Sequence, residues 1–299
     1  MVVSVGDWGA VPAPTAAFRY LLGPGWWAPS PERLRRAVGG RLVLITGASS
    51  GIGAATAIRL AAAGAHVLLV ARRAELLEQV RSEIVAAGGR ADTFATDLSD
   101  LEAVDALVVA VLERHGTVDV VINNAGKSIR RSLADTTDRF HDVTRSNDLN
   151  FLGPVRLLTG LLPAMQARRR GHVVNISTVS VDVPAAHWAV YTAYKSAFEG
   201  WLRCIAPEVL VHGITTTSVH FPLVHTPMSE PVYAKVPGLS ADDAAGAIAR
   251  ALVTRRRLVC PWWVRLAAPV LHAAQGPYDR GAARIMRTSR RRRDGRSGT

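Results

Sequence analysis

The chain has 299 residues, 48% of them hydrophobic, which is enough to bury the core of one large domain or of two small ones. Its net charge of +12 is uneven, because residues 280–299 hold eight arginines and one acid, a charge of +7, which leaves +5 for the rest. The two cysteines, Cys204 and Cys260, lie far apart, which argues against a disulfide framework and a zinc site and favours a reducing compartment.

Residues 1–40 are rich in proline, glycine and tryptophan, and we expect them to form an arm rather than a folded unit. The first residues lack the basic start and the long apolar core of a secretory signal. Together with the two cysteines, this favours a cytoplasmic protein. The apolar part of the arm, residues 18–27, suits a membrane surface or a protein surface, and both interpretations stay open.

From residue 41 to about residue 257, short apolar runs alternate with helix-like segments and no linker interrupts them. We expect strands at residues 42–45, 66–70, 92–95, 118–122, 172–176 and 214–220, and helices at residues 54–63, 75–87, from about 99, at 151–166 and around 191. Strands that are apolar on both faces and alternate with helices are typical of a parallel sheet. The sequence therefore predicts one doubly wound α/β domain with a mostly parallel central sheet flanked by helices.

A glycine-rich turn separates the first strand from the first helix. Glycines let the backbone approach a pyrophosphate closely, and a helix N-terminus offers free N–H groups and the positive end of a dipole. The turn predicts a dinucleotide site in a Rossmann domain, and its spacing, G-x-x-x-G-x-G, points to one branch of dinucleotide binders. The residues expected at the phosphates are Gly47, Ser49, Ser50, Gly51, Ile52 and Gly53.

The second and third strands end in residues that suit the adenosine half of such a cofactor. An NAD-binding protein usually has an acid at the end of the second strand, where it accepts hydrogen bonds from the ribose. This chain has Arg72 and Arg73, which would attract a 2′-phosphate, so we favour NADP(H) over NAD(H). A solvated start of the next helix is the alternative. Asp97 and Leu98 follow the third strand, and Asp97 is placed to meet the adenine amino group.

Two amides and two small residues, Asn123-Asn124-Ala125-Gly126, directly follow the fourth strand. At the carboxyl end of a parallel strand they would line the cofactor crevice, although a plain turn is the alternative. We expect Asn124, Ala125 and Gly126 to contact the cofactor.

Tyr191 and Lys195 are four residues apart on a predicted helix and so share one face. An ammonium beside a phenol stabilises the phenolate, and so lowers the pKa of a tyrosine from its ordinary value of ~10. One ammonium at a wet site does not supply enough stabilisation, so a second positive charge, such as an oxidised nicotinamide ring, is needed. Most Tyr-x-x-x-Lys pairs are solvated helix faces, but this lysine is one of only three in an arginine-rich chain, which favours a chemical role.

Five elements in order make the chain resemble the short-chain dehydrogenase/reductase family: residues 46–53, residues 123–126, Asn150 in Asn-Phe-Leu-Gly, the Tyr191/Lys195 pair and residues 222–226. The resemblance covers about residues 41–257. It implies that Tyr191 is the catalytic acid/base, that Lys195 lowers its pKa and binds the nicotinamide ribose, and that Asn150 lies by a water leading from Lys195 to solvent. It also implies that Pro222, Val224 and Thr226 lie at the nicotinamide, where Thr226 fixes the carboxamide. No metal is expected.

The chain departs from this family at two positions. The serine that orients the substrate usually lies thirteen residues before the tyrosine, where this chain has Thr178. Thr178 keeps a hydroxyl that can donate to a carbonyl oxygen, so we expect it in this role, with Ser177 as second choice and Ser180 as third. Leu223 stands where the family usually has glycine after proline, and would add an apolar wall beside the nicotinamide.

Residues 227–240 would form the segment that covers the substrate pocket in this fold. The segment is mostly apolar, which favours a hydrophobic carbonyl or alcohol substrate, although its residues could simply pack on the domain. Its apolar residues are Met228, Pro231, Val232, Tyr233, Val236 and Leu239, and Lys235 is the exception.

A narrower resemblance covers mainly the C-terminal third, where residues 222–245 are similar to the reductase domain of bacterial fatty acyl-CoA reductases. It implies a long-chain acyl thioester or a fatty aldehyde as substrate, while a ketone, a sterol or a retinoid-like alcohol stays open. The contrasting hypothesis is an NADP-binding scaffold or sensor without catalysis. The complete set of Tyr191, Lys195 and Asn150 argues against that hypothesis.

Residues 258–299 form an extension with an apolar part followed by an arginine-rich tail. Arg265, two prolines and a short length argue against a membrane-spanning helix at residues 258–275. A peripheral contact with the inner face of the membrane and packing on the domain or on a partner subunit are both open. The tail lacks interleaved aromatic residues and a recognition module, so nucleic-acid binding is not favoured. The family resemblance implies a homodimer or homotetramer.

Overall fold

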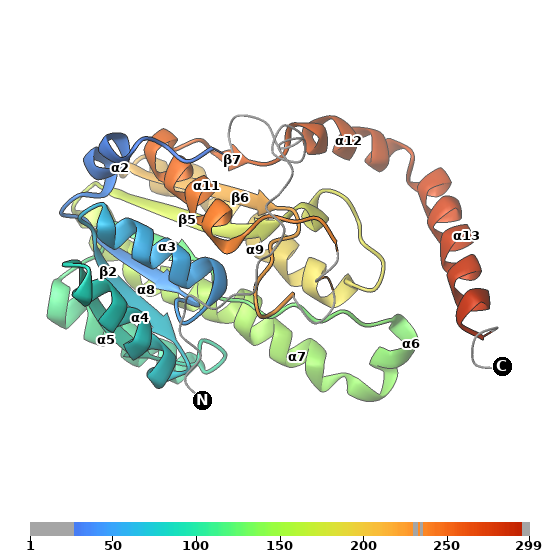
Figure 1. The fold of residues 1–299 in the computed structure, drawn as a ribbon, viewed down its shortest axis with the longest axis horizontal. Coiled ribbons are helices and arrows are strands. Elements are labelled where there is room, and N and C mark those ends of the chain that lie inside the picture. Colours follow the sequence, from blue (N-terminus) through green and yellow to red (C-terminus); the bar gives the residue numbers. More distant parts are fainter. Residues whose placement is uncertain (1–26, 230–232, 234–235, 295–299) are drawn as a thin grey trace.

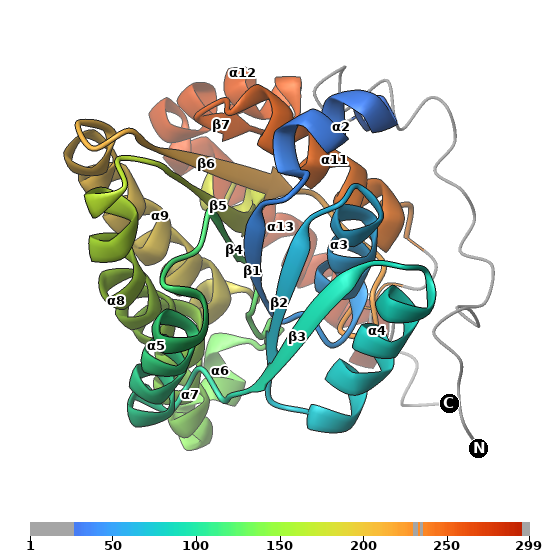
Figure 2. The same ribbon diagram turned by 90° about the vertical axis from the view of Figure 1, so that its left-hand side faces the viewer.

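One seven-stranded sheet organises the molecule, with strand order β3-β2-β1-β4-β5-β6-β7 and every neighbouring pair parallel. The computed structural model describes residues 27–229, 233 and 236–294, and Figures 1 and 2 show it from two sides. The predicted doubly wound α/β class is confirmed. The strands are β1 (Leu42–Thr46), β2 (His66–Ala71), β3 (Arg90–Ala95), β4 (Val120–Asn123), β5 (Gly171–Thr178), β6 (Ile214–Phe221) and β7 (Leu258–Val259).

Helices cover both faces of the sheet and bury one apolar core on each side. Along β1, Val43 and Ile45 belong to one core and Leu44 belongs to the other, which is why this strand is apolar on both faces. One face is covered by α2 (Pro31–Val38), α3 (Gly51–Ala62), α4 (Ala74–Ala86) and α11 (Ala241–Thr254). The other is covered by α5 (Leu101–His115), α8 (Gly153–Ala167) and α9 (Ala189–Leu210).

The expected arm differs from the structure in its last part. Residues 31–38 form α2, which starts with Ser30 as its N-cap and a proline in its first turn. Leu34 and Val38 of this helix are buried in the core that also contains α3 and α11. The chain is therefore packed on the domain from residue 31, while residues 1–26 lie outside the described residues.

The sheet also continues past the expected limit at residue 257. The short strand β7 pairs with β6 through Ser218 and Val219 and forms the edge of the sheet. After it come α12 (Trp262–Ala273) and α13 (Gln275–Asp294), which extends away from the sheet in Figure 1. Among the described residues, no helix is both long and apolar enough to cross a membrane.

A nearly continuous helical segment spans the region where one helix was expected at residues 151–166. It follows the short helix α6 (Leu133–Thr136) and consists of α7 (His141–Asn147), a π-helical turn (Asp148–Leu152) and α8. Asn150 lies in the π-helical turn. Such turns inside helices are often found at functional sites.

The carboxyl ends of β1 and β4 define where a ligand can bind. The chain proceeds from β1 to β2 and β3 on one side of the sheet, and from β4 to β5, β6 and β7 on the other. The loops after β1 and β4 therefore diverge and leave a crevice between them. In open α/β sheets, this switch point is the usual ligand site.

Candidate active site

A cavity of about 600 Å³ lies at the carboxyl ends of the strands. It brings together residues that the sequence places up to 189 positions apart, from Gly47 to Val236. Most of the predicted site residues line it: Gly47, Ser49, Ser50, Gly51, Ile52, Arg72, Arg73, Leu98, Asn124, Ala125, Gly126, Ser177, Thr178, Tyr191, Lys195, Pro222, Val224 and Thr226. Gly53, Asp97 and Asn150 are not among the residues that line it.

The glycine turn is fixed against the loop after β4. Gly47 has φ 66°, and a Cβ on it would lie 2.9 Å from Nδ2 of Asn124 and 3.0 Å from Cα of Ala125. Nδ2 of Asn124 donates to the carbonyl oxygen of Thr46 at 2.9 Å and to that of Gly47 at 3.3 Å. Only glycine fits this backbone and this gap, so the turn and the loop form one rigid wall.

The N-terminus of α3 is suited to an anion. Its N-cap, Ser50, makes no side-chain hydrogen bond to the helix, and the first turn contains no acid. The N–H groups of this turn are therefore not used by a capping side chain, and the helix dipole favours negative charge there. Ser49, Ser50, Gly51 and Ile52 all line the cavity, so these donors face a space where a pyrophosphate fits.

Arg72 and Arg73 form the cationic end of the cavity. Arg73 donates to Oγ of Ser50 at 3.5 Å, and Arg72 lies 3.5 Å from the carboxylate of Asp97. Burial raises the pKa of Asp97, but hydrogen bonds from Ser99 and the charge of Arg72 outweigh burial and hold this pKa below its usual value. Asp97 thus stays ionised behind Arg72, while both guanidiniums stay within reach of a phosphate in the cavity.

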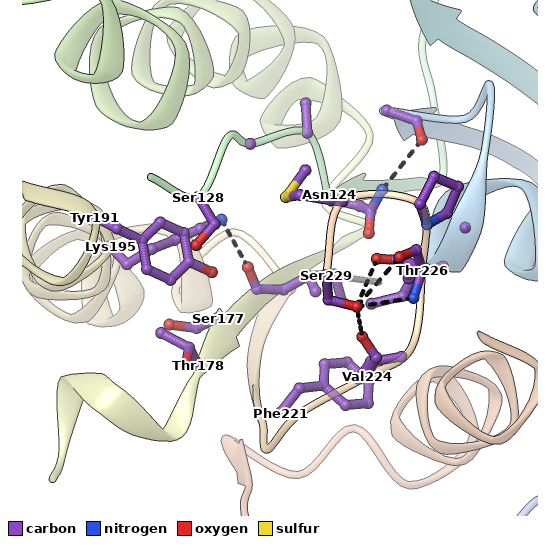
Figure 3. Close-up of a pocket in the computed structure, with 18 of the residues that line it drawn as sticks. Asn124, Ser128, Ser177, Thr178, Tyr191, Lys195, Phe221, Val224, Thr226 and Ser229 are labelled. Atoms are coloured by element: carbon purple, nitrogen blue, oxygen red, sulfur yellow. Dashed lines mark hydrogen bonds between the residues drawn. The ribbon is translucent and has the colours of Figure 1, made fainter. Parts of the chain in front are cut away.

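Tyr191 and Lys195 reach the cavity from the first turns of α9, as Figure 3 shows. The ammonium of Lys195 is buried, and its Nζ donates to the carbonyl oxygen of Ile176 at 3.0 Å. Burial lowers the pKa of Lys195 to about 8 and raises the pKa of Tyr191 to about 12. The lowering of the tyrosine pKa that the sequence suggests is thus not present in the protein alone.

The two values follow from one physical cause, because burial disfavours the charged form of each group. A neutral phenol is the form that can donate a proton to a developing alkoxide, so the raised pKa of Tyr191 suits an acid in the reducing direction. The reverse direction needs a phenolate, which a cationic nicotinamide near the ring would stabilise. This agrees with the expectation that a second positive charge is required.

Gly126 lies between Asn150 and Lys195. A Cβ at Gly126 would lie 2.8 Å from Oδ1 of Asn150 and 3.3 Å from Nζ of Lys195. Asn150 is buried and holds the backbone of Lys127, accepting from its N–H at 3.2 Å and donating to its carbonyl oxygen at 3.3 Å. The structure thus places Asn150 next to Lys195, with only a glycine between them, although it does not line the cavity.

Thr178 belongs to a chain of hydroxyl groups at the end of β5. Oγ1 of Thr192 donates to Oγ of Ser180 at 3.2 Å, and this hydroxyl donates to Oγ1 of Thr178 at 3.2 Å. The N–H of Ser180 also donates to Oγ1 of Thr178, at 3.3 Å. Because Thr178 accepts both bonds, its own proton stays available to a ligand in the cavity. Ser177 lies beside it, buried and without a hydrogen-bond partner among the described residues.

The segment expected to cover the substrate pocket, residues 227–240, is called the lid here, and hydrogen bonds hold it near both of its ends. Val224 and Leu239 form a parallel bridge, and Oγ of Ser229 accepts from the N–H of Thr226 at 3.0 Å and donates to the carbonyl oxygen of Val224 at 2.7 Å (Figure 3). Met228, Tyr233 and Val236 line the cavity as expected for a lid, whereas Leu239 is buried in the core. Pro231, Val232 and Lys235 lie outside the described residues.

Several cavity residues were not predicted from the sequence, among them Trp188 and Arg130. Trp188 packs edge-on against the ring of Tyr191 at 6.0 Å and stacks on Tyr233 at 6.1 Å, so it joins the catalytic helix to the lid. Arg130 lines the cavity from the loop after β4. An aromatic residue three positions before Tyr191 was a usable indication for Trp188, because that spacing places both near one helix face.

A buried polar network connects the strands behind the cavity. Glu199, one turn after Lys195 on α9, accepts from Oγ of Ser218 at 2.6 Å and from Nδ2 of Asn175 at 3.1 Å. His220 lies 2.6 Å from the carboxylate of Asp182 and 3.5 Å from that of Glu199. Burial alone lowers the pKa of His220, but these two acids outweigh burial and raise it to about 9. The imidazolium thus links α9 and β6 to the segment after Thr178.

This network predicts a stability that falls at alkaline pH. The pKa of His220 rises from its ordinary 6.5 to about 9 on folding, so its contribution is complete below pH ~6.5 and is lost as the pH rises to ~9. The shift corresponds to on the order of 3 kcal/mol of unfolding free energy. We expect urea unfolding to show this decline in the wild type and not in His220→Gln. Parallel curves for the two proteins between pH 6 and 9.5 would contradict this assignment.

Comparison with known proteins gives an independent view of this site. The family profile described as short chain dehydrogenase matches residues 41–237. A fatty acyl-CoA reductase of Acinetobacter baylyi is 47% identical over 236 residues, covering 78% of this chain and 80% of the relative. A fatty acyl-CoA reductase of Mycobacterium tuberculosis is 44% identical over 225 residues, covering 74% and 76%. A metagenomic short-chain oxidoreductase crystallised with NADP is 34% identical with a TM-score of 0.66, covering 75% of this chain and 97% of that one.

Proposed function

The chain belongs to the short-chain dehydrogenase/reductase family of oxidoreductases, and we propose that it uses NADPH to reduce fatty acyl thioesters or fatty aldehydes. One observation carries this proposal. A single cavity joins a cationic, glycine-rich end, at Arg72 and Gly47, to a half-buried tyrosine and an apolar lid. A dinucleotide and an apolar substrate can therefore meet at Tyr191.

The cationic end of the cavity fits NADP(H). Arg72 and Arg73 would hold the 2′-phosphate, and the uncapped first turn of α3 would hold the pyrophosphate. Lys195 would donate to the nicotinamide ribose, and Thr226 would hold the carboxamide. When bound, NADPH supplies a hydride from C4 of its nicotinamide. The matched metagenomic oxidoreductase was crystallised with NADP, which supports this choice of cofactor.

The residues of this chain would supply the proton and hold the reacting oxygen. Thr178 would donate a hydrogen bond to the substrate carbonyl oxygen while Tyr191 donates a proton to the alkoxide that develops there. With an aldehyde, the product is an alcohol. With a thioester, one hydride and one proton are taken up, the carbon–sulfur bond breaks, and an aldehyde and a free thiol leave. Lys195 would stabilise the phenolate that Tyr191 becomes.

The apolar walls of the cavity favour a long hydrocarbon chain over a small polar substrate. The cavity that contains Tyr191 is also lined by Trp188, Leu223, Met228, Tyr233 and Val236. Two relatives at 47% and 44% identity are named fatty acyl-CoA reductases, which supports the same substrate class. Leu223, in place of the usual glycine, adds to this apolar wall.

A substrate panel tests the proposal. NADPH oxidation would be followed with dodecanoyl-CoA, dodecanal, a hydrophobic ketone and a sterol, each also with NADH. We expect turnover of the thioester or the aldehyde and a preference for NADPH, because Arg72 and Arg73 have no charged partner on NADH. Turnover of the ketone or sterol alone would contradict the substrate class. No turnover of any compound, with NADPH still bound, would favour the scaffold or sensor hypothesis.

Two further partners are proposed on narrower grounds. Contact of the C-terminal extension with an anionic membrane is supported by Trp262, Leu266 and Val270, which are exposed on one face of α12. Co-sedimentation with anionic vesicles that is unchanged in Leu266→Ser would contradict it.

The homodimer or homotetramer implied by the family is testable by light scattering of the full chain, where a monomer would contradict it.

A further inference from the structure

Arg130 is a cationic residue of the cavity to which the proposed chemistry assigns no role. Among the described residues that line the cavity, four are basic, namely Arg72, Arg73, Lys195 and Arg130, and none is acidic. NADP(H) accounts for the first three. Among these four, Arg130 alone has no assigned ligand, which favours a second ligand with negative charge.

Arg130 lies at the substrate end of the cavity. The N–H of the next residue, Arg131, donates to the carbonyl oxygen of His187 at 2.7 Å, which joins this loop to the segment that carries Trp188. The ring of Trp188 in turn contacts Tyr191. Arg72 follows β2, which lies on the far side of β1 from β4, whereas Arg130 follows β4. The two guanidiniums thus serve opposite ends of the crevice.

Arg130 is also free to bind a ligand. Its residue is exposed while it lines the cavity, so it lies at the rim. Within the described part of the chain, no hydrogen bond or ion pair is found for its side chain, whereas its neighbours Arg131 and Arg139 both pair with the carboxylate of Asp142. Those two arginines share one carboxylate partner, and within the described part of the chain Arg130 has none.

We propose that Arg130 binds a phosphate of the pantetheine carrier that bears the acyl thioester, an inference that rests on the proposed function. The thioester must reach Tyr191, and the apolar walls suit its hydrocarbon chain. The pantetheine arm separates the thioester from its phosphate, which would then lie at the rim. A guanidinium at the rim matches a phosphate in geometry and in charge. Coenzyme A and a phosphopantetheine-bearing protein present this same chemistry.

Steady-state kinetics with matched thioesters test the proposal. Arg130→Ala is expected to raise KM about tenfold for dodecanoyl-CoA and for dodecanoyl-phosphopantetheine, with kcat unchanged, because one charge-assisted contact at a partly exposed site is lost. KM for the neutral dodecanoyl-N-acetylcysteamine and for dodecanal should change less than twofold. Arg130→Lys should restore part of the affinity. Arg139→Ala, which removes a paired arginine of the same region, is the control and should change none of these values.

A binding measurement separates this inference from the proposed function. Calorimetric titration of the NADP⁺-saturated enzyme with dodecanoyl-CoA requires no turnover, and Arg130→Ala should weaken Kd about tenfold. If this loss occurs but neither thioester is reduced, the inference stands and thioester reduction fails. If both thioesters are reduced and their KM is the same in Arg130→Ala as in the wild type, the proposed function stands and the inference is overturned. The inference is also overturned if Arg130→Ala weakens the affinity for dodecanoyl-CoA but not for dodecanoyl-phosphopantetheine. An equal loss of affinity for charged and neutral substrates overturns it as well.

Discussion

Tyr191→Phe is expected to lower kcat about 10³-fold, while the Kd for NADPH changes less than threefold. The substitution removes only the phenolic oxygen, so the ring keeps its contact with Trp188. General acid catalysis by a positioned side chain contributes roughly 10²–10⁴-fold. Stopped-flow measurement of NADPH oxidation with the preferred substrate gives the rate, and fluorescence titration gives the affinity for the cofactor.

Tyr194→Phe is the matched control for this experiment. Tyr194 is also on α9, but it adjoins Lys195 in sequence, so the side chains of these two residues diverge around the helix, and Tyr194 does not line the cavity. Its variant should keep kcat within twofold. Near-normal turnover in Tyr191→Phe, or an equal loss in both variants, would show that the assignment of the acid is wrong.

Gly53→Ala is expected to abolish NADPH binding at concentrations that saturate the wild type, a loss of at least about 100-fold. A Cβ at this position would lie 2.2 Å from the carbonyl oxygen of Gly47 and 2.7 Å from Nδ2 of Asn124. Both atoms belong to the rigid wall between the glycine turn and the loop after β4, so the added methyl group must push that wall apart. Overpacking of this kind typically destabilises a protein by about 1–3 kcal/mol.

Gly200→Ala provides the control for the methyl group itself. Gly200 lies within α9, and nothing lies within 4 Å of a Cβ placed there. Alanine favours a helix by about 0.8–1.0 kcal/mol over glycine, so this variant should be at least as stable as the wild type and bind NADPH normally. Equal NADPH affinity in Gly53→Ala and the wild type would contradict the close packing of the turn.

Cavity residues that lie within short sequence motifs could be predicted from the sequence. The glycine turn and the Tyr191/Lys195 pair each depend on contacts within a few residues, and the fold brings them together because each follows a strand of one parallel sheet. The helical offset of four placed Tyr191 and Lys195 on one face, as found. Arg72 and Arg73 line the cavity, as expected from their position at the end of β2.

Other features depended on contacts between distant segments. Arg130 reaches the cavity because its loop bonds to residue 187, which no local pattern indicates. The link between His220, Glu199 and Asp182 joins a strand, a helix and a loop that are far apart in sequence. The strand β7 has only two residues, so its apolar run could not be told from the helix that follows.

The helix α2 and the pKa of Tyr191 differ from the predictions made from the sequence for two other reasons. The start of α2 carries a usable pattern, a serine followed by proline and an acid, but the surrounding prolines, glycines and tryptophans hid it. The charge of Lys195 alone predicts a lowered pKa for Tyr191, but burial of the phenol raises it. In the folded protein the lysine is buried too, and its own pKa falls.

Transfer of deuterium tests the central claim, that Tyr191 and the glycine turn assemble one site for hydride transfer to an acyl carbonyl carbon. The full chain would be given dodecanoyl-CoA or dodecanal with NADPH deuterated at either face of C4, and the product analysed by mass spectrometry. We predict one deuterium on carbon 1 of the product for each reduction, from one face only, with an equal amount of NADP⁺. NADP⁺ formed without deuterium in the product, or no product under saturation with NADPH, would contradict the account.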